Sequence, residues 1–123
     1  QVSYGGDDSY EWFGGTNNLK YLIAYNGVDD DFDVDFGYSG KVQFGVAIRN
    51  PNIADASQSN GFEVDNDGAG SSNTPFTSPT FSNVTEIGPK EDRTTTISTL
   101  FNNAAQLRRN NKIKIHNRPY KVL

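Results

Sequence analysis

The stretch DDDFDVDF, residues 29 to 36, decides the fold, because carboxylates and apolar side chains alternate through its second half. Five of its eight residues are aspartates, and the other three are apolar. Successive side chains of a β-strand point to opposite faces of the sheet, so Phe32 and Val34 share one face while Asp33 and Asp35 share the other. The stretch therefore predicts an amphipathic strand with an acidic outer surface.

The same pattern recurs at irregular spacing. DDSYEWFGG (7–15) and SNGFEVDND (59–67) repeat it, and NNAAQLRRN (102–110) fits it loosely. Four further strand-like runs follow these copies: LKYLIAY (19–25), KVQFGVAI (41–48), FSNVTEI (81–87) and KIKIH (112–116). Units of two short strands and two turns, with almost no helix, are typical of solenoid coils that are stable only when stacked. We therefore predict an all-β fold, a right-handed parallel β-helix of about four irregular coils.

Stacking these copies in register assigns the faces of the first strand in each coil. Two columns are predicted to point inward: Tyr10, Phe32, Phe62 and Ala105, followed by Trp12, Val34, Val64 and Leu107. Two ladders are predicted to point outward: Glu11, Asp33, Glu63 and Gln106, followed by Phe13, Asp35, Asp65 and Arg108. The outer ladders are rich in like charge, which raises carboxyl pKa values and lowers stability unless a cation intervenes.

Composition excludes several classes of function. The chain has 123 residues, a net charge of −4, one histidine and no cysteine, so disulfides and thiol catalysis are excluded and a histidine-based triad is disfavoured. Its acidic outer strands would repel phosphates, so no nucleic-acid partner is expected. No apolar run is long enough to span a membrane. The absence of methionine, even at position 1, indicates a processed chain or a fragment.

Calcium is the cation that this acidic surface would suit best, because it prefers oxygen ligands and tolerates flexible geometry. The candidate ligands come from adjacent turns: Asp7, Asp8, Asp29, Asp30, Asp31 and Asp33. The spacing differs from the twelve-residue EF-hand loop, which ends in glutamate. The alternative is that these aspartates are solvated acids that cap strands and discourage edge-to-edge aggregation.

No residue is marked out as catalytic. The candidate bases for a lyase are Lys20, Lys41, Arg49 and Arg108, and stacked Glu11, Asp33 and Glu63 would supply the carboxylate pair of a glycoside hydrolase. Phe13, Phe36 and Tyr38 are predicted to be exposed beside the acidic ladder, where they would form a carbohydrate-binding surface. The polar stretch 54–78 is predicted to be a loop on the side of the solenoid, a place where recognition often resides.

Three long motifs, VSYGGDDSYEWFGG (2–15), DDDFDVDFGYSGKVQFG (29–45) and SNGFEVDNDG (59–68), resemble secreted or cell-surface proteins of Bacteroidetes-type bacteria. Those proteins are predicted to be right-handed parallel β-helices with an architecture similar to that of pectate lyases. The resemblance implies a partial β-helix domain over residues 1–117 and a longer parent protein with more coils before it. The ending RPYKVL (118–123) departs from the family, so residues 118–123 are predicted to be a separate tail.

Together these observations predict an extracellular or outer-membrane-associated scaffold or glycan-binding module, stabilised by calcium. Two alternatives remain open: a polysaccharide lyase or glycoside hydrolase acting on acidic polysaccharide, and a structural spacer of a long surface protein. The expected partners are a polysaccharide and either the remaining coils of a parent chain or another protein chain. The candidate ligand-binding residues are Glu11, Asp33, Asp35, Tyr38, Glu63, Asp65 and Arg108.

Overall fold

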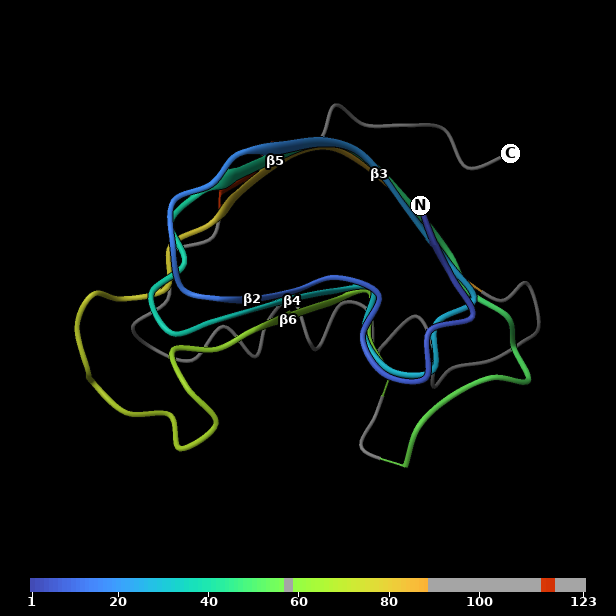
Figure 1. Cartoon of the computed structure of the whole chain (residues 1–123), viewed down its shortest axis with the longest axis horizontal. Helices are drawn as coiled ribbons and strands as arrows, with labels where there is room; N and C mark the ends of the chain where they lie inside the picture. The colour runs from blue at the N-terminus through green and yellow to red at the C-terminus, as the bar shows by residue number, and fades with distance from the viewer. Residues whose placement is uncertain (57–58, 89–113, 117–123) are drawn as a thin grey trace.

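The computed structural model describes residues 1–56, 59–88 and 114–116, and these residues form strands and turns without a helix. The strands are β1 (Val2–Ser3), β2 (Glu11–Phe13), β3 (Leu19–Tyr25), β4 (Phe32–Asp35), β5 (Lys41–Ile48), β6 (Phe62–Val64), β7 (Thr80–Ile87) and β8 (Lys114–His116). Strands β1 to β7 alternate between two sheets, ordered β1-β3-β5-β7-β8 and β2-β4-β6, β8 joins the larger sheet beside β7, and every pairing is parallel. In Figure 1 successive coils overlie one another around a common interior. The predicted parallel β-helix is confirmed.

The register of the smaller sheet matches the one predicted from the repeats. Trp12 pairs with Val34 and Val34 with Val64, while Phe32 pairs with Phe62. Trp12, Phe32 and Val34 are buried, and Phe62 and Val64 are half-buried. The alternation of apolar and acidic residues was therefore sufficient to identify the inner face of β2, β4 and β6.

The core is a stack of aromatic rings between the two sheets. The ring of Tyr10 lies 5.8 Å from that of Phe32, and Phe32 lies 5.3 Å from Phe62. Phe62 meets Phe81 of the larger sheet edge-on at 5.0 Å. Rings at these separations gain contact energy beyond the area that they bury. Gly45 of β5 leaves room for this stack, because a Cβ at that position would lie 3.3 Å from Phe32 Cζ.

Each long strand of the larger sheet bends at one residue. Tyr21, Phe44 and Asn83 occupy equivalent positions in β3, β5 and β7, and all three have positive φ, between 54° and 61°. The paired register skips them, since Lys20 pairs with Gln43 and Leu22 with Gly45. The bend divides each strand into two segments, and both face the core.

The stretch 54–78 is two loops rather than one, because β6 lies within it. The segments before and after β6 project beyond the smaller sheet at opposite ends of its strands (Figure 1). Asn66 organises the second loop: its amide donates to the carbonyl oxygens of Ser71 and Asn73, and its own oxygen accepts from the Thr77 amide. These loops flank the outer surface of β2, β4 and β6.

The prediction that Tyr38 is exposed is wrong. Its side chain is fully buried, its ring stacks on Trp12 at 5.4 Å, and its hydroxyl donates to the Asn17 carbonyl oxygen at 2.9 Å. Burial also raises the Tyr38 pKa to about 12. The ring therefore belongs to the core beside Trp12 and not to the surface beside the acidic ladder.

Replacing Tyr38 with phenylalanine is expected to lower the free energy of unfolding by about 1 to 2 kcal/mol, because the Asn17 carbonyl loses its donor while the ring packing is kept. Urea denaturation checks this. Tyr25→Phe is the matched control, since Tyr25 is only half-buried, and it is expected to leave the midpoint nearly unchanged. Equal midpoints for Tyr38→Phe and the control would contradict the role given to this hydrogen bond.

Several predictions fall outside the described residues. They concern the loosely fitting copy at 102–110, with Ala105, Gln106, Leu107 and Arg108, and the separate tail at 118–123. For the last strand, the backbone of β8 pairs in parallel with β7 at Thr80, Phe81 and Ser82. The predicted run at 112–116 is thus a strand over Lys114–His116.

Candidate functional site

The outer surface of β2, β4 and β6 carries the candidate site, and we call it the acidic face. Its central ladder is Glu11, Asp33 and Glu63, which pair directly across the three strands. Asp35 and Asp65 lie further along the same surface, and Asp35 pairs with Phe13. Equivalent positions on neighbouring strands are about 4.8 Å apart, so these carboxyl groups repel one another when ionised.

Asp33 lies at the centre of the acidic face and is only 7% exposed, although it points away from the core. Burial raises the pKa of its carboxyl to about 8, and the charges of Asp35 and Asp8 add to this effect. Its Oδ1 atom is buried and takes no hydrogen bond from any residue that the structure describes. An unsatisfied buried carboxyl oxygen is costly, so this atom is a natural position for a proton or a cation.

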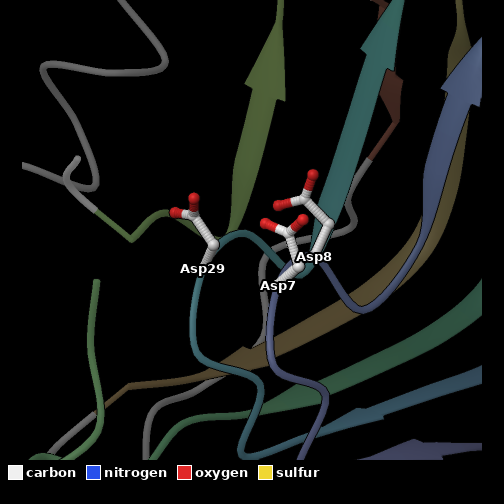
Figure 2. Close-up of side chains that lie close together, drawn as sticks. All are labelled: Asp7, Asp8 and Asp29. Carbon is white, nitrogen blue, oxygen red and sulfur yellow. The ribbon is translucent and has the colours of Figure 1, made fainter. Parts of the chain in front are cut away.

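Two groups of three carboxyls converge around Asp8. One consists of Asp8, Glu11 and Asp33, and the other of Asp7, Asp8 and Asp29. Within each group, one oxygen per residue lies within 4.8 Å of the others. Figure 2 shows the second group: Asp7 and Asp8 lie side by side at the turn before β2, and Asp29 lies on the turn of the next coil. Stacking of coils thus brings together residues that are 22 positions apart.

The environment of each group shifts its proton affinity. Burial raises the pKa of Asp8 to about 6, although the hydrogen bond that its Oδ1 accepts from the Asp30 amide opposes this. Burial, followed by the charge of Asp65, raises the Asp35 pKa to about 6. The pKa of exposed Glu11 is also raised, by partial desolvation and then by Asp7. Perturbed carboxyls gathered on one surface are typical of functional sites.

Asp30 lies apart from these two groups and is 1% exposed. Its Oδ1 accepts the Asn60 amide, and burial followed by a hydrogen bond with Glu63 raises its pKa to about 9. The raised pKa favours the protonated carboxyl of Asp30 at neutral pH, which donates a hydrogen bond to Glu63 of the central ladder.

Asp31 turns toward the larger sheet and is fully buried. Its carboxylate pairs with Arg49 at 3.0 Å, and the Arg49 guanidinium also donates to the carbonyl oxygens of Asn60 and Asp29. Glu86 of β7 completes the group, with its carboxyl oxygens buried and its pKa raised to about 9 by burial and by Asp31. This buried cluster was missed by sequence analysis, which treated Arg49 only as a candidate base and did not single out Glu86.

Of the three aromatic residues predicted to be exposed beside the acidic face, two are exposed there. Phe13 is 66% exposed and Phe36 is 55% exposed, and their rings lie 5.6 Å apart. Tyr38 contributes nothing to this surface because it is buried. Lys20 and Lys41 begin strands of the other sheet, and Arg49 is paired with Asp31, so these three candidate bases do not lie on the acidic face. Arg108 lies outside the described residues.

The chain belongs to the family of pectate-lyase-like β-helix domains, whose model matches residues 1–121. The match supports the parallel β-helix architecture seen here. A search of the curated proteins gave no match, and a search of the solved structures gave none either. Among the residues that the structure describes, no helix is long and apolar enough to cross a membrane.

Proposed function

We propose that this chain is a glycan-binding β-helix module whose acidic face binds polysaccharide with the help of a divalent cation, best suited to calcium. The observation that carries the proposal is the buried Oδ1 of Asp33, which has no hydrogen-bond donor among the described residues and belongs to a carboxyl group clustered with those of Asp8 and Glu11. A cluster of surface acids alone would be explained by solvation. A buried, unsatisfied oxygen inside such a cluster is not explained in that way.

The residues present fit a hard cation. Asp8, Glu11 and Asp33 offer three carboxylate oxygens within 4.8 Å of one another, and oxygen ligands from separate turns suit calcium, which tolerates variable coordination. Asp7 and Asp29 offer further oxygens, because they form a second group that shares Asp8 with the first. Ionisation of Asp33 is unfavourable in the protein alone, and a bound cation would supply the positive charge that favours its carboxylate form. Two of the predicted ligands have other partners: Asp30 accepts a hydrogen bond from the Asn60 amide, and Asp31 pairs with Arg49.

The rest of the acidic face provides contacts for a sugar chain. Phe13 and Phe36 present exposed rings against which the apolar face of a pyranose can pack. Glu63, which is exposed, can accept hydrogen bonds from sugar hydroxyls. An acidic polysaccharide would be repelled by these carboxylates unless cations lie between the two, so its binding would require the cation site.

The rigid solenoid makes the module a scaffold as well as a binding surface. Family membership and a sugar-binding surface support a location outside the cell or at its surface, where polysaccharides are encountered. The Bacteroidetes-type origin implied by the sequence motifs belongs to the same proposal. A purely structural spacer would need neither the cation site nor the exposed rings.

Calcium is expected to raise the midpoint of thermal unfolding at pH 8. A ligand that binds only the folded state at a hundredfold excess over its Kd stabilises that state by about 2.7 kcal/mol. The measurement is a pair of melts, one with calcium and one with chelator. Asp33→Asn is expected to abolish the difference, because the amide offers one neutral oxygen and removes the charge at the centre of the site.

Asp55→Asn is the matched control, since it removes the same charge from an exposed position in the loop before β6. Its calcium response should equal that of the wild type. The proposal would be contradicted if calcium still raised the melting midpoint of Asp33→Asn, or if it did not raise that of the wild type. The carboxylates of the acidic face would then be solvated surface groups.

A hydrolase is the second candidate, and the pKa of Asp33 favours it. A carboxyl that keeps its proton near neutral pH, next to exposed Glu11 and Glu63, has the properties of a general acid beside a carboxylate. Retaining glycosidases place two such groups about 5 to 5.5 Å apart, close to the strand spacing. Incubation with polygalacturonate separates the candidates: shortened products that disappear in Asp33→Asn indicate a hydrolase, and unchanged chain length supports the binding module.

A further inference from the structure

The bend in the larger sheet exposes aromatic rings at strained positions. Tyr21 and Phe44 stack with their centroids 5.3 Å apart and their planes at 10°, and they remain 73% and 39% exposed. Both have φ of 61°, in the left-handed region that bulky side chains avoid. Such a conformation is unfavourable for a bulky residue, and here burial of the ring does not offset that cost.

The position itself does not require an aromatic ring. Asn83 occupies the equivalent bend in β7 with φ of 54°, and asparagine is the non-glycine residue best suited to this conformation. The six non-glycine residues with positive φ in the described chain are two asparagines and four exposed aromatics: Asn26 and Asn83, and Tyr4, Tyr21, Phe36 and Phe44. Exposed rings kept at a conformational cost point to a ligand.

The charge around these rings differs from that of the acidic face. Lys20 and Lys41 are exposed at the start of β3 and β5, and half-buried Gln43 adds an amide on the same outer surface. Glu86 is the acidic residue in β3, β5 and β7, and its carboxyl points away from this surface, toward Gly61. The outer surface of these described strands therefore carries lysines and no carboxylate, although the chain as a whole has a charge of −4.

We propose that this surface, made of Lys20, Tyr21, Lys41, Gln43, Phe44 and Asn83, is a second glycan site that binds a uronate-bearing oligosaccharide without a metal ion. The lysines pair with sugar carboxylates, and the amides of Gln43 and Asn83 bond to hydroxyls. The exposed ring pair contacts the apolar face of a pyranose. The ligand runs along the stack, across β3, β5 and β7. This surface lies on the opposite side of the solenoid from β2, β4 and β6 (Figure 1) and does not depend on the cation site.

The test measures binding of oligogalacturonate by the whole chain in chelator, which separates this site from the acidic face. Tyr21→Asn with Phe44→Asn is the informative variant, because asparagine suits the bend and the fold is expected to keep or raise its melting midpoint. We expect this variant to lose at least tenfold in affinity. Tyr4→Asn is the matched control, an exposed ring at φ of 54° outside the surface, and its affinity should be unchanged.

Lys20→Gln with Lys41→Gln is expected to weaken binding and to reduce its dependence on salt. Absence of binding by the wild type in chelator would overturn the proposal. So would unchanged affinity of the double asparagine variant, or a lower melting midpoint without loss of binding, which would make the ring pair structural. Equal or tighter binding of a neutral maltooligosaccharide or of oligodeoxythymidine would assign the surface to another ligand. Self-association that the asparagine variant abolishes would assign it to a second copy of the chain.

Discussion

Raising the pH from about 5 to about 9 in the presence of chelator is expected to lower the midpoint of thermal unfolding by on the order of 20 °C. The groups responsible are carboxyls that hold protons in the folded state, above all Asp33 and Asp30, with pKa values of about 8 and about 9. In the unfolded chain these groups titrate near 4. Most proteins with paired carboxylates show the opposite trend over the acidic part of this range.

The direction follows from proton linkage. Between the unfolded and folded pKa values the folded state binds more protons, so stability is full below pH 4 for these groups and is lost as the pH rises. All four groups contribute to the loss from about pH 4 upward. The contributions of Asp8 and Asp35 end near pH 6, whereas those of Asp33 and Asp30 continue to about pH 8 and pH 9. A pKa shift as large as that of Asp33 corresponds to a change in the free energy of unfolding on the order of 5 kcal/mol.

Two variants make this prediction specific. Asp33→Asn has no proton to lose, so its melting midpoint should fall less between pH 7 and 9 than that of the wild type. Asp55→Asn removes an exposed aspartate elsewhere and should follow the wild-type curve. Calcium is expected to restore part of the lost stability at high pH, because the cation favours the ionised cluster. A midpoint that rises steadily with pH in chelator would contradict the burial of these carboxyls.

The repeats made the solenoid predictable, because coil geometry depends on local alternation. Phe32, Asp33 and Val34 alternate as a strand must, and the same alternation at Glu11–Phe13 and Phe62–Val64 was enough to set the register of three strands. The bend at Tyr21 and Phe44 was not predicted. Neither residue type favours positive φ, so no sequence signal distinguished these residues from ordinary strand positions.

The candidate site was predictable as a set of residue types but not as a geometry. Asp29, Asp30 and Asp31 are consecutive and chemically identical, yet Asp29 faces Asp7 and Asp8, Asp30 faces Glu63, and Asp31 faces Arg49. A turn points its side chains in different directions, and its dihedral angles are not encoded in a run of identical residues. Tyr38 was misplaced for the same reason, since it follows a tight turn at Gly37.

Asp31, from the turn before β4, forms a buried charged cluster with Arg49 and Glu86. Its members come from the turn before β4, the end of β5 and β7, so it joins both sheets. A Cβ at Gly61 would lie 2.6 Å from Glu86 Cδ, and glycine is therefore needed where the chain enters β6 over this carboxyl. The cluster has two carboxyls and one guanidinium, and a proton kept on Glu86 leaves it electrically neutral.

Arg49→Met is expected to lower the free energy of unfolding by about 3 to 5 kcal/mol, because it leaves the fully buried Asp31 without a counter-charge. It also removes the donors to the carbonyl oxygens of Asn60 and Asp29, which hold the turns before β6 and β4 together. Urea denaturation at pH 7 gives the measurement, with the slope m used to confirm that the same surface is exposed on unfolding.

Glu86→Gln is the matched variant in the same cluster, and its expected cost is below that of Arg49→Met. Glu86 already carries a proton at pH 7, so a neutral amide of similar size alters the charge of the cluster little. Adding Asp31→Asn to Arg49→Met should recover part of the lost stability, since it removes the unpaired charge that the first substitution creates. An Arg49→Met protein within about 1 kcal/mol of the wild type, or no recovery in the double variant, would show that Asp31 does not depend on Arg49 for its burial.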